Sequence, residues 1–520
     1  MVRASGSKQL VLATMVLASV LASVFWSALA LALPDIRDDL GGSTDELRWA
    51  WTAAGLAYAA TLVLAGRIGD TRGARGTLVA GFALLAGGAA GAAAAPSPPV
   101  LIAALCVMGL AGAVITPMSL AVVTETATPE RRARNIALWA GAGSLAYGLG
   151  PAIGGAVTHL AGWRWIFIAY VPLALLGLVL TRAGVPASRP ESTARVDYAG
   201  AALLAGGLVA LTLTLGQGAA WGWLGAPTVA LAVLAVVLLG ACVRRESRVP
   251  DPLLDLRLFA LRVFSVANAV LFFVNFVLGT LLFFVPLYLQ EVRVETPLTA
   301  GLLLVPCSGG ILVAMALGAR LTERGRTREA VAGGLVLAGA ATMGLVALSD
   351  TAAVPVVTSI LTVLGGGLGL VTSPLQAIAM DAVPARAAGA ASGILATSRG
   401  LGTALGVAAT GAVFSSLNVT RTLDAAERDG VRLTEEAATR LDTALADGEA
   451  ESAQLLAIAR DAWVDAFTGA LWLSVAAIGA GLVLVLARMP RSEQRAADDR
   501  GDDHAQEQHQ LGGDHAAGHA

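Results

Sequence analysis

Charged and hydrogen-bonding side chains are rare inside the apolar stretches of this sequence, and Arg399 and Asn275 are two of them. A charge inside a bilayer costs at least about 2.5–3.5 kcal/mol, so Arg399 is a candidate for binding or coupling. The alternative is that its long side chain reaches the membrane surface. Asn275 either hydrogen-bonds to a molecule in a cavity or ties two helices together.

Aromatic residues form a second group of candidates: Phe25, Trp26, Tyr147 and Tyr288 could line a cavity for flat, apolar or cationic molecules. Ordinary packing between helices explains these residues equally well. His159 is the only histidine outside the C-terminal tail. Because catalysis and metal binding need several such groups at one place, we expect no enzyme, no metal site and no cofactor. The sequence also lacks a glycine-rich phosphate loop with lysine.

The composition shows which elements must position these residues. The chain of 520 residues is 56% hydrophobic and 14% charged, with a mean hydropathy of +0.72. These values are typical of a polytopic membrane protein in a lipid bilayer. A net charge of −2 argues against a nucleic-acid partner. The three cysteines lie in apolar runs and are expected to be buried thiols: Cys106, Cys242 and Cys307.

A helix that spans a bilayer needs about 20 mostly apolar residues. The sequence predicts about fourteen such spans, at 11–33, 48–66, 77–95, 100–123, 136–158, 165–182, 198–217, 226–243, 264–289, 299–318, 330–348, 354–379, 388–416 and 465–488. Arginine is concentrated in alternate loops, which indicates that these loops are cytoplasmic. We therefore expect a multi-pass protein with both termini in the cytoplasm.

The stretch from Gly141 to Pro172 combines two unusual patterns. Its first part is a helix rich in small residues, in which Gly143, Gly150, Pro151, Gly154 and Gly155 permit close packing and a bend. Its second part contains Trp163, Arg164 and Trp165, in which two aromatic rings flank a cation, as expected where a helix meets the membrane surface. Ordinary membrane packing is the alternative interpretation.

The connection between the second and third spans carries a similar mixture of glycine and charge. Gly66 and Gly73 permit a close approach and a tight turn. Asp70 is placed to cap the next helix or to pair with an arginine, and Arg72 and Arg75 supply positive charge. The alternative is a plain basic loop. A weaker copy of this pattern lies at 319–325, which indicates an internal duplication.

These motifs resemble those of the major facilitator superfamily, in its fourteen-helix drug:proton antiporter branch. The glycines of 143–155 are similar to the antiporter motif of the fifth helix, and Trp163 to Phe167 to a signature of that branch. The loop at 66–75 resembles the conformational latch of the superfamily. The resemblance implies two six-helix bundles with pseudo-two-fold symmetry and two inserted helices. It implies export of an amphipathic drug or secondary metabolite by alternating access, driven by protons.

The chain departs from this family where proton coupling is usually assigned. Phe25 stands at the position of the usual first-helix aspartate, and Leu105 at that of the fourth-helix arginine. The absence of both charged residues is physically consistent, because either charge alone would be buried without a partner. An alternative function is therefore an uncoupled or differently coupled transporter of lipids, peptides or other metabolites.

The resemblance also suggests how the chain is divided. We expect a first bundle at 1–182, a linker pair at 183–262, a second bundle at 263–490 with an outer loop at 417–464, and a disordered cytoplasmic tail at 491–520. We further expect a monomer in the plasma membrane with a small amphipathic substrate.

Overall fold

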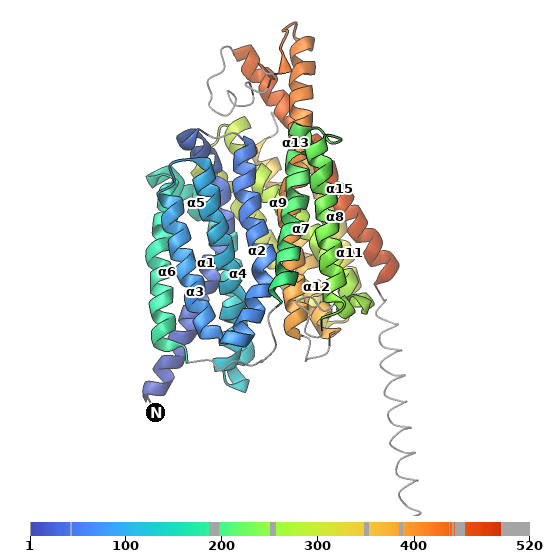
Figure 1. Cartoon of the computed structure of the whole chain (residues 1–520). Coiled ribbons are helices and arrows are strands. Elements are labelled where there is room, and N and C mark those ends of the chain that lie inside the picture. Colours follow the sequence, from blue (N-terminus) through green and yellow to red (C-terminus); the bar gives the residue numbers. More distant parts are fainter. Residues whose placement is uncertain are drawn as a thin grey trace, which may run out of the picture.

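The computed structural model describes residues 2–41, 44–186, 197–249, 256–347, 353–383, 388–435, 437–438, 441 and 453–489. Within these ranges the chain is helical and contains no strand. The helices run side by side as parallel and antiparallel rods, and the nearer ones cover others that lie behind them (Figure 1). The predicted all-α membrane fold is confirmed.

The first bundle is formed by six helices: α1 (Val2–Leu40), α2 (Thr44–Arg72), α3 (Ala74–Ala93), α4 (Pro98–Thr126), α5 (Pro129–Ala161) and α6 (Arg164–Gly184). Proline in the first turn starts α4 and α5, where its missing N–H costs no hydrogen bond. Gly73 and Gly162 each have a φ of 90° and turn the chain between neighbouring helices.

An extra pair, α7 (Tyr198–Trp221) and α8 (Ala226–Glu246), follows the first bundle. The second bundle then contains α9 (Arg262–Leu287), α10 (Pro297–Glu323), α11 (Thr327–Val346), α12 (Val354–Asp381), α13 (Ala388–Arg428) and α15 (Ala453–Arg488). Two short elements flank α9, the 3-10 helix η1 (Leu256–Ala260) and the π-helix η2 (Tyr288–Val292).

Twelve helices of the described chain are long and apolar enough to cross a membrane. The helices α2 and α5, of 29 and 33 residues, lie beside them in the first bundle (Figure 1). Together these helices account for the fourteen predicted spans. The last two are longer than predicted, because α13 continues to Arg428 and α15 begins at Ala453.

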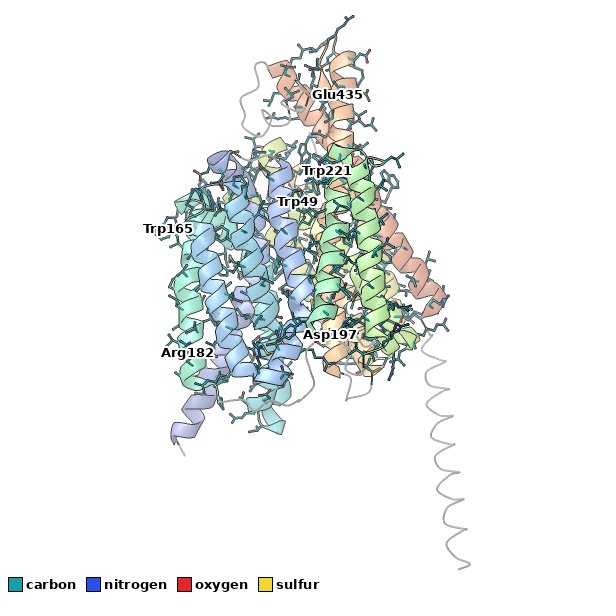
Figure 2. The ribbon with its side chains drawn as sticks, viewed as in Figure 1. Trp49, Trp165, Arg182, Asp197, Trp221 and Glu435 are labelled. Carbon is teal, nitrogen blue, oxygen red and sulfur yellow. The ribbon has the colours of Figure 1, made fainter. Side chains whose placement is uncertain are left out.

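The two ends of the bundles differ in their side chains. Figure 2 shows Trp49, Trp165 and Trp221 toward one end and Arg182 and Asp197 toward the other. We call these the Trp165 end and the Arg182 end. The extensions of α13 and α15, with Glu435 between them in sequence, project beyond the Trp165 end (Figures 1 and 2).

The extra pair is held mainly through α7. Leu204 and Leu208 of α7 pack with Leu56 and Ala60 of α2, and Leu401 of α13 lies against the same cluster. The neighbouring helix α8 exposes a run of valine and leucine side chains, Val229, Val233, Leu234, Val236 and Val237. Thus α7 covers the line where α2 meets α13, and α8 presents an apolar surface suited to lipid.

Candidate functional site

The glycine-rich part of α5 packs closely against α1. A β-carbon at Gly143 or Gly150 would overlap the hydroxyl of Ser19 or Ser27, respectively. At Gly154 a β-carbon would lie 2.6 Å from the Ala28 Cα atom. Three of the predicted motif positions therefore hold α5 against its neighbour within the first bundle, where only glycine fits.

The opposite side of the same helix makes the contact between the two bundles. A β-carbon at Gly155 would overlap the carbonyl group of Pro297 in α10. Reciprocally, a β-carbon at Gly301 of α10 would overlap the carbonyl group of Pro151. The backbones of α5 and α10 thus cross in direct contact, and the crossing lies in the half of α5 nearest the Trp165 end.

A second contact between the bundles joins α2 and α13. A β-carbon at Gly55 would lie 3.5 Å from the Ala404 Cβ atom, and one at Gly400 would lie 3.1 Å from the Ala59 Cβ atom. The two bundles therefore meet along two pairs of helices, α5 with α10 and α2 with α13. We call this surface the seam.

A buried ion pair closes the seam at the Trp165 end. The Arg37 guanidinium, at the end of α1, donates to the Glu291 carboxylate over 2.8 Å, and the side chains are 2% and 4% exposed. Beside it, the Gln290 amide donates to the Leu31 carbonyl over 3.3 Å. Arg37 also forms an ion pair over 3.1 Å with the neighbouring Asp38, which is half-exposed. Removing one partner of a buried pair is destabilising, because the remaining charge loses part of its compensation.

The segment that carries Glu291 has an irregular backbone. It is a π-helix, a form that occurs mostly as a single turn and often at functional sites. Val294 follows it with a φ of 56°, a conformation that β-branched residues rarely adopt. Such strain persists only where surrounding contacts fix the conformation.

The predicted surface anchor lies at the same end. The Trp163 indole donates to the Asp39 carboxylate over 3.2 Å, and Arg164 forms an ion pair with the same carboxylate. The Arg164 guanidinium also stacks 4.3 Å from the centre of the Trp163 ring. Trp163 is buried, whereas Trp165 is 53% exposed on the outside of the bundle (Figure 2).

The predicted latch loop lies at the Arg182 end. Gly73 makes the turn between α2 and α3, as its positive φ requires. Nothing lies within 4 Å of a β-carbon at Gly66, so the close approach expected there is absent. It occurs instead at Gly69, where a β-carbon would overlap the Met118 side chain of α4. The side chain of Asp70 lies outside the described part of the structure.

The two arginines of this loop contact other helices. Arg75 donates to the Arg182 carbonyl over 2.5 Å, which ties the start of α3 to the end of α6. Arg72 donates to the Tyr198 hydroxyl over 3.4 Å, which joins α2 to α7. Both bonds lie at the surface, and neither crosses to the second bundle.

Arg399 lies halfway along the seam. It belongs to α13 and is half-buried, and its charge acts on the hydroxyl groups of Tyr58 in α2 and Tyr147 in α5. Trp26 of α1 packs edge-on against Tyr58 with ring centres 5.8 Å apart. The structure thus brings Arg399 and Trp26 to one region, together with two tyrosines.

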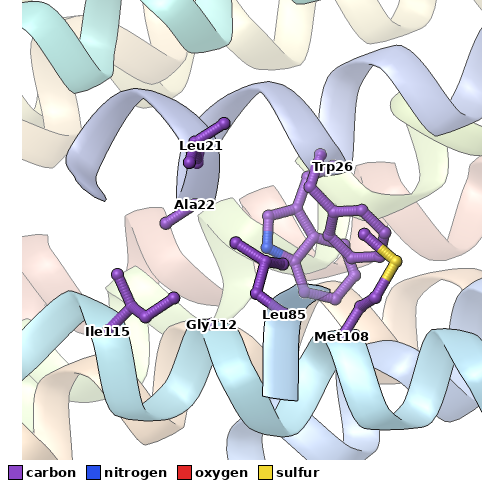
Figure 3. A pocket seen from close by; sticks show the side chains of 8 residues that line it. Leu21, Ala22, Trp26, Leu85, Met108, Gly112 and Ile115 are labelled. Atoms are coloured by element: carbon purple, nitrogen blue, oxygen red, sulfur yellow. The ribbon is translucent and has the colours of Figure 1, made fainter. Parts of the chain in front are cut away.

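Phe25 lines a small apolar pocket inside the first bundle rather than the seam. The pocket is narrow and is lined by Leu21, Ala22, Phe25, Trp26, Leu85, Met108, Gly112 and Ile115 (Figure 3). Phe25 is 5% exposed, and Leu105 on the adjacent α4 is fully buried. The positions that usually hold coupling charges are therefore occupied here by packed apolar side chains.

Two of the predicted cavity residues have other environments. The Asn275 amide donates to the Leu271 carbonyl of its own helix over 2.8 Å, so neither predicted use of that donor is seen. Tyr288 is 3% exposed and packs with Trp463 and Phe467 inside the second bundle. The segment η2 places this ring in the core of the second bundle, and its role in a cavity stays a prediction.

The sequence analysis missed Arg37, Glu291 and Tyr58. Arg37 and Glu291 lie near the ends of predicted spans, where charges are ordinary. Their separation of 254 positions leaves no local pattern that would pair them. Tyr58 is a single aromatic in an alanine-rich helix, and only the packing of α2 on α13 reveals its neighbour Arg399.

Known proteins with similar sequences are transporters of one superfamily and drug-resistance proteins. The model of the Major Facilitator Superfamily matches residues 15–407. The chain is 32% identical over 399 residues to the Multidrug resistance protein Stp of Mycobacterium tuberculosis, which covers 76% of this chain and 74% of Stp. It is 33% identical over 415 residues to the Puromycin resistance protein pur8 of Streptomyces alboniger, covering 77% and 81% of the two chains. It is 30% identical over 413 residues to the Methylenomycin A resistance protein of Streptomyces coelicolor, covering 79% and 86%.

Solved structures show the same fold at low sequence identity. A bacterial homolog of the human lysosomal transporter Spinster, in an inward-facing and unoccupied conformation, aligns with a TM-score of 0.64 at 14% identity, covering 93% of this chain and 98% of that one. The xylose transporter XylE from E. coli, in a partially occluded inward open conformation, aligns with a TM-score of 0.57 at 12% identity, covering 94% and 99%.

Proposed function

The chain belongs to the Major Facilitator Superfamily, and from this premise we propose that it carries amphipathic antibiotics across the plasma membrane by alternating access, driven by the proton gradient. It is a multi-pass secondary transporter that exports drugs, and it is not an enzyme. The substrates named for its relatives, puromycin and methylenomycin A, indicate the size and chemistry of molecule to test first.

The observation that carries the alternating-access proposal is the buried ion pair between Arg37 and Glu291. Alternating access needs a contact between the bundles that forms on one side of the membrane and breaks when that side opens. This pair joins the two bundles at one end only. Opening that end would return both charges to water, so the pair is suited to a contact that forms and breaks.

We propose that the Trp165 end faces outward and that both termini lie in the cytoplasm. The connections at the Arg182 end contain arginine clusters, for example Arg72 and Arg75 after α2 and Arg244, Arg245 and Arg248 after α8. Such clusters favour the cytoplasmic side. We also retain the division into bundles at 1–182 and 263–490 with a linker pair at 183–262, in a protein that acts as a monomer.

Proton coupling needs side chains that can bind a proton. Neither Phe25 nor Leu105 can bind a proton, so coupling in this chain would use groups other than the usual pair. The apolar residues at these two positions also favour a second candidate function, which is an exporter of similar molecules that is not tightly coupled to protons. The two candidates differ in one measurable property, the response of export to a protonophore.

The test is an accumulation and resistance panel in a host that lacks its own drug pumps. Cells that express the chain are compared with cells that carry the empty vector, using puromycin, methylenomycin A and the fluorescent dye ethidium. We expect lower accumulation of at least one compound, restored by a protonophore. Lower accumulation that ignores the protonophore would favour the uncoupled exporter, and unchanged accumulation of every compound would contradict drug export.

A further inference from the structure

Arg399 occupies the middle of the membrane-spanning region. It follows Ala388, the first residue of α13, by eleven positions, which is about 16 Å of helix. Its neighbour Tyr58 is the central residue of α2, which runs from Thr44 to Arg72. Since the hydrocarbon core is about 30 Å thick, both residues lie near its midplane, where transporters of this architecture bind their substrates.

No residue in the described ranges neutralises the guanidinium of Arg399. Its Nε atom is buried and has no hydrogen-bond partner, and Arg399 forms no ion pair with any residue in the described ranges. Arginine has five donors and cannot be deprotonated in proteins. A charge inside the membrane raises the free energy of the fold unless a ligand or another group pairs with it.

The surrounding sequence contains no carboxylate to serve as that group. The middle segments of the four seam helices and of α1, α4, α9 and α12, which pack against them, contain no aspartate or glutamate. These segments are 20–30, 52–64, 105–120, 142–155, 268–280, 303–313, 361–372 and 395–410. Arg399 is the one charged residue in these segments. The field at mid-depth is therefore positive, which repels a cation and attracts an anion.

Aromatic groups from the first bundle complete the region. A β-carbon at Gly400, next to Arg399 in sequence, would lie 3.4 Å from the ring of Tyr58. The Arg399 charge acts on the hydroxyl groups of Tyr58 and Tyr147. The Tyr58 hydroxyl also hydrogen-bonds with Thr116. The ring of Tyr58 contacts Trp26, behind which lies the small apolar pocket of the first bundle (Figure 3). A charged donor thus comes from one bundle and flat apolar surface from the other.

From this arrangement we propose that Arg399 binds the acidic group of the substrate, so that the exporter selects amphipathic anions with an aromatic or apolar body. The carboxylate or sulfonate accepts hydrogen bonds from the guanidinium, and its apolar part packs on Tyr58 and Trp26. The inference rests on the proposed export function and names its substrate class. It replaces the sequence-based expectation that the aromatic residues serve apolar or cationic molecules.

The test compares two fluorescent aromatic probes of opposite charge, carboxyfluorescein and ethidium. Binding to the purified full chain is followed by quenching of tryptophan fluorescence, and export is followed in pump-deficient cells. We expect wild type to bind and export carboxyfluorescein, and Arg399→Gln to bind it at least tenfold more weakly. Arg399→Lys, which keeps the charge but not the planar donors, should retain part of the affinity. Tyr58→Phe should have a smaller effect than Arg399→Gln.

The matched control is Arg488→Gln, which removes an exposed arginine at the end of α15 and should leave carboxyfluorescein binding unchanged. Equal carboxyfluorescein affinity in wild type and Arg399→Gln overturns the proposal, and so does a wild type that binds ethidium but not carboxyfluorescein. In the second case the export function stands and only the substrate class is wrong. If wild type exports no compound of either charge or of the resistance panel, the export function itself fails.

Discussion

At the scale of single residues, Asp197 shows how one carboxylate fixes the start of the extra pair. It caps α7 by accepting a hydrogen bond from the Gly200 N–H over 2.9 Å. It also pairs with Arg245 of α8 over 2.8 Å, and its side chain is 4% exposed. The hydrogen bond from the Arg245 side chain is the main reason that the pKa of Asp197 lies below its ordinary value.

This pKa shift predicts how the extra pair responds to acid. A carboxyl group whose folded-state pKa is depressed stabilises the fold above its unfolded pKa of about 3.9 and loses that contribution as pH falls through the folded-state value. At pH 7, Asp197→Asn should lower the apparent melting temperature by about 1–3 °C. The difference from wild type should shrink below pH 4. Asparagine also caps helices, so the variant isolates the charge.

The measurement is thermal unfolding of the purified protein in detergent from pH 7 down to pH 3, with the exposed Asp465→Asn as the control. Equal melting temperatures of wild type and Asp197→Asn at pH 7 would show that the pair with Arg245 contributes nothing to stability.

The types of the residues in the sequence indicate which side chains stand out chemically. They do not indicate which neighbours each side chain contacts in the fold. The rare intramembrane Arg399 was identified from sequence because a charge stands out in an apolar run. The surroundings of Tyr288 could not be predicted, because helical spacing predicts a face only for a regular helix and this residue begins a π-helix. Asn275 satisfied its donor within its own helix, which no pattern of residue types reveals.

At the scale of elements, the glycines of α5 have distinct roles that their spacing does not separate. Gly150 and Gly154 face α1 in the same bundle, whereas Gly155 faces α10 of the other bundle. The motif thus packs one helix against two neighbours at once. Its bend residue, Pro151, contributes its carbonyl to the same crossing, opposite Gly301.

We predict that Gly155→Ala and Gly141→Ala have opposite outcomes, although both change glycine to alanine in α5. At Gly155 the new methyl group would overlap the Pro297 carbonyl, so α10 must move away and the seam loosens. At Gly141 nothing lies within 4 Å, and the change should be neutral or stabilising by up to about 1 kcal/mol through helix propensity.

The measurement is the rate of drug export per molecule of protein in the membrane, with thermal unfolding in parallel. Gly155→Ala should export at least several-fold more slowly, while Gly141→Ala exports at the wild-type rate. Full export by Gly155→Ala would mean that the contact of α5 with α10 does not limit the transport cycle.

The boundaries of the last two spans illustrate a limit of hydropathy. Polar residues at 417–464 ended both predicted spans, yet α13 and α15 continue into this stretch. Phe414, in the last turn of the predicted span, packs against Trp463 with ring centres 5.2 Å apart, at the base of the two extensions. A helix can leave the membrane without ending when aromatic contacts of this kind support it.

At the scale of the whole molecule, the two-bundle architecture could be predicted because the motifs resemble those of the major facilitator superfamily and the pattern at 66–75 recurs at 319–325. The seam could not, because the residues that form it are far apart in sequence. Arg37 and Glu291 meet only when the end of α1 lies beside η2. Arg399 meets Tyr58 only when α13 packs on α2. Long-range contacts of this kind leave no periodic signal in a single sequence.

The conformational balance of the molecule should depend on the Arg37–Glu291 pair. Truncating one member of a buried ion pair costs about 3–5 kcal/mol where the other charge keeps no partner. In Glu291→Ala, Arg37 keeps its ion pair with Asp38, so the cost while the Trp165 end is closed is smaller. Opening that end hydrates Arg37 and removes this cost. Since 1.4 kcal/mol is a factor of ten, the open population should rise by about tenfold or more relative to the closed one.

Spin labels at Leu160 of α5 and Leu302 of α10, both exposed, would report this change as a longer distance across the Trp165 end in a background without Cys106, Cys242 and Cys307. Arg37→Ala should give the same shift as Glu291→Ala, and the exchanged pair Arg37→Glu with Glu291→Arg should recover part of the short distance.

The control is Arg326→Ala, which breaks the ion pair between Arg326 and Glu329. The side chains of these two residues are 60% and 56% exposed, respectively. Such exposed pairs contribute little, so the control should keep the wild-type distance distribution. In the orientation that we propose, the protein opens this end to release a drug and closes it to return. A Glu291→Ala variant with an unchanged distribution would therefore place the closure of this end elsewhere on the seam, at the crossing of α5 with α10.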